Sequence, residues 1–246
     1  MNKIWVPKEQ CDVANSLEET GQVLRPGMVL LKNYIPISEQ VNIVKKCREL
    51  GLGPSGFYRP GYKDGAKLRL FMMCLGLDWD PQTRAYAQIR PHDNVVPPDI
   101  PSHFSSVVAR SLEDSHRLIK KVMDVTDADD MLPKMSPDLC IVNFYTTNGR
   151  LGLHQDRDET DDSLRKGLPV VSMSIGDSAE FLYGNQRDVE KADSLMLESG
   201  DVLIFGAESR HIFHGVTNIF PRTAPHGLLE KTGLLPGRLN LTFRKY

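Results

Sequence analysis

The first half of the chain contains two segments whose apolar residues recur every three or four positions. The longer segment predicts a helix over about 101–125, with apolar residues along one stripe and charged residues elsewhere. The other predicts a helix over 36–50, because Pro36 favours the start of a helix and Gly51 favours its end. Glycine, proline and tyrosine are frequent over 51–65, so we expect a long loop there.

The second half changes to short segments with the composition of β-strands, separated by turn signals such as 147–149. Strands are expected at Met28–Leu31, Leu139–Tyr145, Pro169–Ile175, Ala179–Tyr183, Ser194–Leu197, Asp201–Phe205, Ile212–Val216 and Arg238–Phe243. Helices followed by a series of short strands indicate an α+β fold, in which a helical layer covers one side of a β-sandwich.

These patterns divide the chain into three parts that together form a single domain. Residues 1–25 are expected to be a loosely structured lead-in with a short helix near 13–20. Residues 26–138 supply the helical layer, and residues 139–246 supply the strand-rich core. The 246 residues are enough to bury one sizeable core.

Composition excludes several classes of protein. Lys and Arg number 30 against 32 Asp and Glu, so nucleic acid could be attracted only by a local basic patch. No apolar run approaches the roughly 20 residues of a membrane helix, and the first 25 residues resemble no targeting segment. The 4 cysteines form no CxxC pair, so we expect reduced thiols in an intracellular protein. The cytoplasm or the nucleus is the expected compartment, and an organelle is the alternative.

A histidine and a carboxylate stand two positions apart at His154 and Asp156. On an extended backbone both side chains would leave the same face. His214, on another expected strand, offers a second imidazole. Two histidines and one carboxylate are the facial ligand set of non-haem iron(II), whereas zinc sites more often have sulfur ligands. Taken alone, the His-x-Asp pattern is equally typical of ordinary surface residues.

Polar and apolar residues alternate without a break over 238–244. On a strand the apolar residues would face the core, whereas Arg238, Asn240 and Arg244 would share the opposite face. Two guanidinium groups on one face match a dicarboxylate through bidentate, charge-assisted hydrogen bonds. The alternative for this segment alone is a solvated edge strand with scattered charge.

Four motifs follow one another in the second half: Asn143-Phe-Tyr145, Leu151-Gly-Leu-His154-Gln-Asp156-Arg-Asp158-Glu159, Glu208-Ser-Arg210…His214-Gly215 and Arg238-x-Asn240-x-Thr242-x-Arg244. In order and spacing they resemble the AlkB family of iron(II)- and 2-oxoglutarate-dependent dioxygenases, which remove alkyl groups from nucleobases. The resemblance covers about 140–244 and extends more loosely from residue 28. It implies a double-stranded β-helix (jelly-roll) sandwich, with a nucleotide-recognition lid within 26–138.

The resemblance also implies a role for each matching residue. The iron(II) ligands would be His154, Asp156 and His214. The residues expected to bind 2-oxoglutarate are Asn143, Tyr145, Arg238, Asn240 and Arg244. Asp158 falls at an acidic position that faces the target base, where a carboxylate would favour a positively charged base. With O2, 2-oxoglutarate would be converted to succinate and CO2 while an N-methyl group is oxidised and lost as formaldehyde.

The stretch over 57–79, in which aromatic residues are interleaved with Lys and Arg, lies where the family has its lid. A base must leave its stack to reach a buried metal, and flipped bases are held between aromatic or apolar faces. Trp79 is the candidate stacking partner, with Tyr58 as a second, although both could be packing residues. Arg69, Glu159 and Arg210 are further candidates for contact with the substrate.

The leading hypothesis is therefore a monomeric oxidative demethylase of N-alkylated bases in RNA or DNA, with methyladenine as the expected target and no membrane attachment. One alternative is a 2-oxoglutarate-dependent hydroxylase of a protein or a small molecule. Another is a nucleic-acid reader that keeps the fold but has lost catalysis. The intact ligand set and both arginines argue against the second alternative, since a pure binding protein gains nothing from an iron site.

Overall fold

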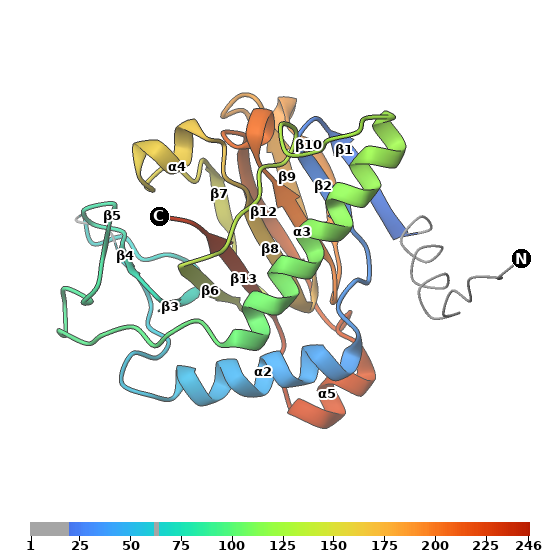
Figure 1. Cartoon of the computed structure of the whole chain (residues 1–246). Coiled ribbons are helices and arrows are strands. Elements are labelled where there is room, and N and C mark those ends of the chain that lie inside the picture. The colour runs from blue at the N-terminus through green and yellow to red at the C-terminus, as the bar shows by residue number, and fades with distance from the viewer. Residues whose placement is uncertain (1–19, 62–63) are drawn as a thin grey trace, which may run out of the picture.

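The structure, a computed structural model, describes residues 20–61 and 64–246. Two sheets form a sandwich, and two long helices lie against the outer face of the larger sheet (Figure 1). All strand pairings in the described part of the chain are antiparallel. The predicted α+β, jelly-roll architecture is confirmed.

The larger sheet has seven strands in the order β1-β2-β11-β8-β13-β6-β3. Their bounds, in that order, are Gly21–Arg25, Met28–Leu31, Val202–Phe205, Val170–Gly176, Arg238–Arg244, Leu139–Tyr145 and Phe71–Leu75. The smaller sheet has four strands in the order β10-β9-β12-β7. Their bounds are Asp193–Leu197, Ser178–Gly184, Phe213–Phe220 and Leu151–His154.

Most strands of the larger sheet contribute to two apolar layers because their side chains alternate, whereas one face of β13 is polar. On β2, Val29 and Leu31 pack in the layer beneath the helices, whereas Met28 and Leu30 pack between the two sheets. All four are at most 4% exposed. Each such buried side chain contributes on the order of 1.5–3 kcal/mol to folding. The larger sheet is thus packed on both faces, so its strands keep the polar side chains that they carry in fixed positions.

Helices α2 (Ile37–Gly51) and α3 (Ser102–Met123) form the helical layer, and the short helix α5 (His226–Thr232) lies beside α2. The apolar stripe of α3 includes Phe104, Val107 and Ile119, all fully buried. The helix α4 (Asp161–Arg165) and two 3-10 turns, η1 (Val189–Lys191) and η2 (Ala207–Ser209), connect strands. No helix in the described ranges is both long and apolar enough to cross a membrane.

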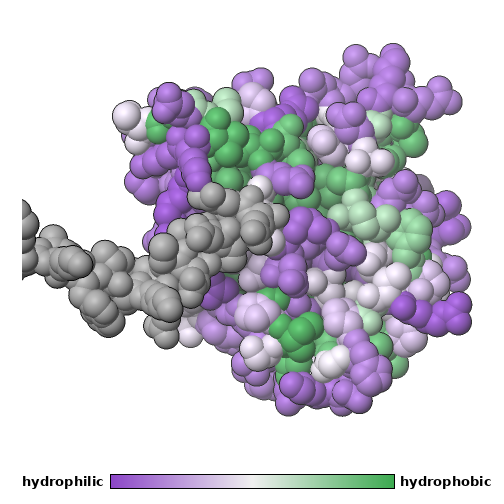
Figure 2. All heavy atoms as spheres, turned by 90° about the vertical axis from the view of Figure 1, so that its right-hand side faces the viewer, coloured by the Kyte–Doolittle hydropathy of each residue, from purple (hydrophilic) through white to green (hydrophobic). Residues whose placement is uncertain are grey.

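A two-stranded hairpin lies apart from the two main sheets, at the left of Figure 1. It consists of β4 (Asp78–Asp80) and β5 (Ala85–Ala87), and Trp79 pairs with Tyr86 across it. The opposite side of the molecule, where β1 ends the larger sheet, carries a band of hydrophobic side chains among hydrophilic ones (Figure 2). The hairpin belongs to 26–138, the region in which the resemblance implies a lid.

The segment boundaries expected from the sequence differ from the observed layers. β1 lies within the expected lead-in, so that part of 1–25 is a strand of the main sheet. The helix expected near 13–20 falls outside the described residues except for Thr20. β2 and β3 also belong to the same sheet as the strands after residue 139. The sequence patterns missed β1, β3, the β4–β5 hairpin, α4 and α5, all of which are short.

Candidate active site

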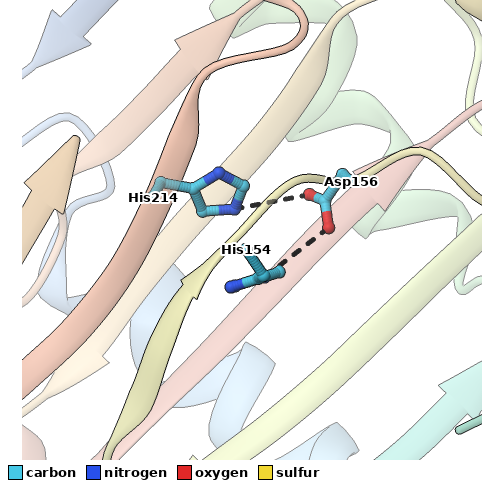
Figure 3. Close-up of side chains that lie close together, drawn as sticks. All are labelled: His154, Asp156 and His214. Carbon is cyan, nitrogen blue, oxygen red and sulfur yellow. Dashed lines mark ion pairs between the residues drawn. The ribbon is translucent and has the colours of Figure 1, made fainter. Parts of the chain in front are cut away.

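Three side chains meet inside the sandwich at one end of the smaller sheet (Figure 3). The Nε2 atoms of His154 and His214 lie 3.8 and 3.7 Å from the two carboxylate oxygens of Asp156. All three ligand atoms lie within 4.8 Å of one another, and no other such group occurs among residues 20–61 and 64–246. This distance and donor set suit one iron(II) ion held by two imidazoles and a carboxylate.

Strand pairing brings the two histidines together. His214 on β12 is the direct antiparallel partner of His154 on β7, and their ring centroids are 4.4 Å apart. The residue after His214 must be glycine-sized, because a Cβ on Gly215 would lie 2.6 Å from the carbonyl oxygen of Leu151. Each imidazole also places its Nδ1 near a backbone carbonyl, that of Gly152 at 2.9 Å or Ile212 at 3.2 Å. Such bonds leave Nε2 of each ring as the ligand atom.

The protonation states favour metal binding. Burial, together with the neighbouring His154, lowers the pKa of His214 to about 4, so its imidazole is neutral at pH 7. Burial alone would raise the pKa of Asp156, but Arg244 and the two imidazoles hold it below its ordinary value. A neutral imidazole and an ionised carboxylate are the forms that coordinate iron.

A buried network of charges holds the loop that carries Asp156. Glu159, whose side chain has no exposed surface, accepts from Arg210 at 2.8 Å and from Arg244 at 2.7 Å. Arg210 also donates to the backbone carbonyl of Asp156, and Arg244 lies 3.3 Å from its carboxylate. The hydroxyl of Tyr86 donates to Glu159 at 3.1 Å, which connects the hairpin to this network. Two arginines thus balance two carboxylates in a space with almost no water.

β13 pairs with β6 in the larger sheet, with Asn240 opposite Asn143 and Arg238 opposite Tyr145. Arg238 is 1% exposed and donates to the hydroxyl of Ser174 at 2.9 Å. Its Nε and Nη1 have no partner, nor do Oδ1 of Asn143 and Nε of Arg244 (further down the strand). Buried polar groups without partners are rare, so these atoms mark a place for a polar ligand.

The unpartnered atoms fit 2-oxoglutarate. Burial lowers the pKa of Arg238 to about 10, and no carboxylate of the described residues forms an ion pair with it. A ligand carboxylate would supply that missing negative charge through charge-assisted hydrogen bonds. Asn143, Tyr145, Asn240 and Arg244 line the same cavity as the metal-binding triad. A diacid in this pocket can therefore lie between Arg244 and the triad, with the guanidinium of Arg238 5.7 Å from the ring centroid of Tyr145.

The cavity has a volume of about 470 Å³, which is in the usual range for a ligand pocket. Its apolar walls come from Leu70, Met72, Ile141, Phe181, Phe205 and Val216. At its mouth are Trp79 and Asp158, with the indole Nε1 donating to the carboxylate at 3.0 Å. The walls thus leave room for a flat, apolar group between the mouth and the triad.

Four of the substrate contacts expected from the sequence are not at this pocket. Glu159 and Arg210 are buried in the charge network, so neither is positioned to contact a substrate. The ring of Tyr58 packs against Arg90, whose guanidinium carbon lies 5.0 Å from the ring centroid. Arg69 is exposed beside a separate groove. The physical reason is that long-range partners, which a linear sequence does not reveal, determine where a charge or ring points.

Several residues of the site were missed by sequence reasoning. Arg84 at the tip of the hairpin forms an ion pair with Asp158, and Tyr86 bonds to Glu159. Ser174 on β8 holds Arg238. The only sequence signal for the first two is the turn over 80–84, which has one aromatic residue on each side, Trp79 and Tyr86. Strands of three residues are too short for that signal to stand out.

Comparison with known proteins gives the same family. Residues 27–244 match the model of the 2OG-Fe(II) oxygenase superfamily. "DNA N(6)-methyladenine demethylase ALKBH1C" of Arabidopsis thaliana is 60% identical over 227 residues, which are 92% of this chain and 50% of that protein. "Alpha-ketoglutarate-dependent dioxygenase AlkB homolog" of Caulobacter vibrioides is 34% identical over 227 residues, covering 89% of this chain and 88% of that protein.

Among solved structures, that of OsALKBH1 matches with a TM-score of 0.87 and 55% identity, covering 92% of this chain and 100% of that chain. The chain spans about half the length of the Arabidopsis relatives, with 50%, 53% and 47% of three of them matched. Matches of this extent to the superfamily, to the bacterial homologue and to the solved structure agree with the arrangement of the triad and the arginines. The chain belongs to the AlkB family of iron(II)- and 2-oxoglutarate-dependent oxygenases.

Proposed function

We propose that this chain is a dioxygenase that removes methyl groups from adenine bases in nucleic acid. The observation that carries the proposal is one cavity that holds the His154, Asp156 and His214 triad together with unpartnered buried atoms of Asn143 and Arg244. Arg238, which also has unpartnered guanidinium atoms, packs over the ring of Tyr145, another residue of the cavity lining. If these side chains had only a structural role, their buried polar atoms would be expected to have hydrogen-bond partners within the protein. A bound keto-diacid beside a metal satisfies both groups at once.

In this reaction the protein positions the reactants and shapes their electrostatic environment. When bound, iron(II) would supply the oxidising chemistry by which O2 converts 2-oxoglutarate to succinate and CO2 and hydroxylates an N-methyl group, which is then lost as formaldehyde. His154, Asp156 and His214 would hold the metal, and Arg238 would orient the diacid. The buried Glu159 network keeps the Asp156 loop in one place while substrates enter and leave.

The outer half of the pocket suits a flipped base. Trp79 at the mouth offers a flat stacking surface, and its indole is fixed by the bond to Asp158. The apolar walls behind it exclude water from the path between the mouth and the triad. Base stacking on an aromatic side chain contributes about 1–3 kcal/mol and tolerates any base. Asp158 lies where it can accept a hydrogen bond from a base amino group.

A groove next to the pocket supports a nucleic-acid substrate. The exposed Arg59 and Arg69 line it, and the exposed Arg150 lies beside Arg69; we name these three residues the arginine patch. Arg69 and Arg150 are direct backbone partners, and the described residues provide no carboxylate in an ion pair with any of the three. Like charges opposite each other are unfavourable unless an anion lies between them. Phosphate groups of a substrate strand would supply that anion.

The arginine patch can be tested by its salt dependence. We expect Arg69→Gln/Arg150→Gln to weaken oligonucleotide binding and to reduce the slope of log affinity against log salt by about 1–2, because each phosphate contact contributes roughly 0.7–0.9. Arg48→Gln, an exposed change on α2, is the matched control. Fluorescence anisotropy over a salt series measures the slope. An unchanged slope would remove the arginine patch from the substrate path.

The names of the relatives bear on the target base and on the kind of nucleic acid. Three relatives are named N(6)-methyladenine demethylases of DNA, one of them with the qualifier "probable", and a fission yeast relative is named a tRNA demethylase. These names support methylated adenine as the target in DNA or RNA. We propose N6-methyladenine in a single-stranded or locally opened strand, since the target base must leave its stack.

The decisive experiment incubates the purified chain with iron(II), 2-oxoglutarate, ascorbate and oligonucleotides that carry N6-methyladenine. Formaldehyde and succinate should appear and should be lost in His154→Ala. His226→Ala is the matched control, because that histidine is 85% exposed on α5 and outside the triad. Succinate without any dependence on methylated nucleic acid would favour a protein or small-molecule hydroxylase. Oligonucleotide binding without iron binding would favour a catalytically silent reader.

The proposal also includes a monomer that acts inside the cell. Cys47, Cys74 and Cys140 are buried free thiols, which fits a reducing compartment. Light scattering of the purified chain would test the oligomeric state. Fractionation of cells that express a tagged chain would test the compartment.

A further inference from the structure

The acidic side chain at the pocket mouth is already engaged within the protein. Nη2 of Arg84 lies 2.6 Å from Oδ1 of Asp158, and Nε of Arg84 lies 3.4 Å from Oδ2. The indole of Trp79 donates to Oδ2 as well, at 3.0 Å. The Asp158 side chain is 14% exposed and that of Arg84 is 49% exposed. The carboxylate therefore faces the pocket with both of its oxygens bonded and its charge matched.

The hairpin is shaped to present Arg84. This residue ends the turn between β4 and β5 with φ at +57°, and its backbone N–H donates to the carbonyl of Asp80 at 2.7 Å. The left-handed conformation directs the chain back toward Trp79 and Tyr86, which pair across the hairpin. Arg84, Trp79 and Asp158 consequently line the same mouth.

Among the residues that the structure describes, no other acidic group in the pocket is free to attract a cation. Their side chains bring two carboxylates to the lining, that of Asp158 and that of the metal ligand Asp156. Arg84 pairs with the first, and Arg244 lies 3.3 Å from the second. The remaining charged side chains of the lining are arginines, at positions 157 and 187. A base with a positive charge on its ring would thus enter a pocket that offers it no uncompensated negative charge.

We propose that Arg84 is a specificity-determining residue, which pairs with Asp158 and thereby makes the pocket favour neutral methylated bases over cationic ones. Methylation of the exocyclic N6 of adenine leaves the base neutral, whereas methylation of ring N1 makes it a cation. The inference rests on the proposed function and specifies its substrate class. Asp158 keeps acceptor capacity for a neutral amino group, because each carboxylate oxygen has two lone pairs.

The test compares two oligonucleotides that differ only in carrying N1-methyladenine or N6-methyladenine. We expect Arg84→Gln to shift the ratio of kcat/KM values toward the N1-methylated substrate by about tenfold, the scale of one partly screened charge interaction. Arg84→Lys keeps the positive charge and should stay near the wild-type ratio. Gln82→Ala, in the same exposed turn, is the control for disturbance of the hairpin. An unchanged ratio in Arg84→Gln, or an equal shift in Gln82→Ala, would overturn the proposal.

A second variant shows whether the effect passes through Asp158. In an Asp158→Asn background, the Arg84→Gln change should no longer shift the ratio, since the paired charge is absent. Binding of the two oligonucleotides to chelator-treated protein provides a readout that does not require turnover, and the same shift is expected there. An undiminished shift in the Asp158→Asn background would refute the pairing. Absence of formaldehyde release from either oligonucleotide by the wild-type chain would instead refute the proposed function.

Discussion

The inner wall of the pocket is built from long strands of the two sheets, whereas its mouth is a hairpin of two three-residue strands held by side-chain contacts. Asn143, Arg238 and Asn240 lie on central strands with neighbours on both sides. The β4–β5 hairpin, in contrast, is fixed to the metal-binding loop by three side chains: Trp79, Arg84 and Tyr86. The backbone of the wall is therefore set by sheet hydrogen bonds, and that of the mouth by a few polar contacts.

The difference separates two tasks. Metal and 2-oxoglutarate chemistry requires groups held within a fraction of an ångström, which a doubly packed sheet provides. Admission of a base requires a surface that can open and whose chemistry can vary, which a small hairpin provides. Changes in the wall should abolish a common step of the reaction. Changes in the mouth should alter which substrate is used and how tightly it binds.

The largest expected effect comes from the wall. We expect Asp156→Asn to lower turnover by at least about a hundredfold, because even partners of metal ligands contribute 10- to 100-fold to affinity or activity. Succinate formation and metal content by atomic absorption check this. Asp162→Asn, an exposed change a few residues further along the chain, should behave as wild type. Full metal content in Asp156→Asn would contradict the assignment of this ligand.

Arg238→Ala should act on 2-oxoglutarate alone. Loss of one buried charge-assisted pair should raise the KM for 2-oxoglutarate by roughly a hundredfold, about 2–3 kcal/mol, while iron affinity changes little. The measurement is succinate formation at varied 2-oxoglutarate concentration. Arg222→Ala, an exposed arginine after β12, serves as the matched control. A KM equal to that of the wild type would contradict the role of the unpartnered guanidinium.

Glu159→Gln tests the network that connects wall and mouth. Removal of one buried negative charge leaves Arg210 and Arg244 partly uncompensated, so we expect the free energy of unfolding to fall by about 2–4 kcal/mol. Urea denaturation of the metal-free protein measures this loss. Glu190→Gln, on the exposed turn η1, should change stability by less than about 0.5 kcal/mol. Equal stability of the two variants would mean that the network is not needed for folding.

The smallest effect is expected at the mouth. Trp79→Ala should raise the KM for a methylated oligonucleotide about tenfold through lost base stacking, while succinate formation uncoupled from the oligonucleotide is retained. Trp79→Phe should restore much of the affinity, because a phenyl ring still stacks. Initial rates at varied oligonucleotide concentration separate KM from kcat. A fall in kcat with no change in KM would place Trp79 in the wall rather than in the mouth.

The contrast between the wall and the mouth also explains what could be predicted from the sequence. The alternation over 238–244 correctly assigned each side chain of β13 to a face, because a period of two is a local property. The sequence patterns could not show that Glu159, Arg210 and Arg244 meet, since their contacts span up to 85 residues. The hairpin strands have three residues each, too few for a periodic pattern.

Predictions for two aromatic residues, Trp79 and Tyr58, therefore had different outcomes. Trp79 was expected at the target base and does line the mouth, whereas Tyr58 packs beneath Arg90 and His92. Both aromatic residues lie in a basic stretch, and only the tertiary fold distinguishes them. β3 was missed for a related reason, because its buried apolar run carries no alternation of polar and apolar residues.

Anaerobic titration of the purified chain with iron(II) and then 2-oxoglutarate tests the central claim most directly. Chelation of a ferrous ion by a keto acid produces a visible charge-transfer band. We predict one bound iron per chain and a band that saturates with 2-oxoglutarate, lost in His214→Ala and shifted to much higher 2-oxoglutarate concentration in Arg238→Ala. No band in the wild-type chain, or a band unaffected by both substitutions, would contradict the site described above.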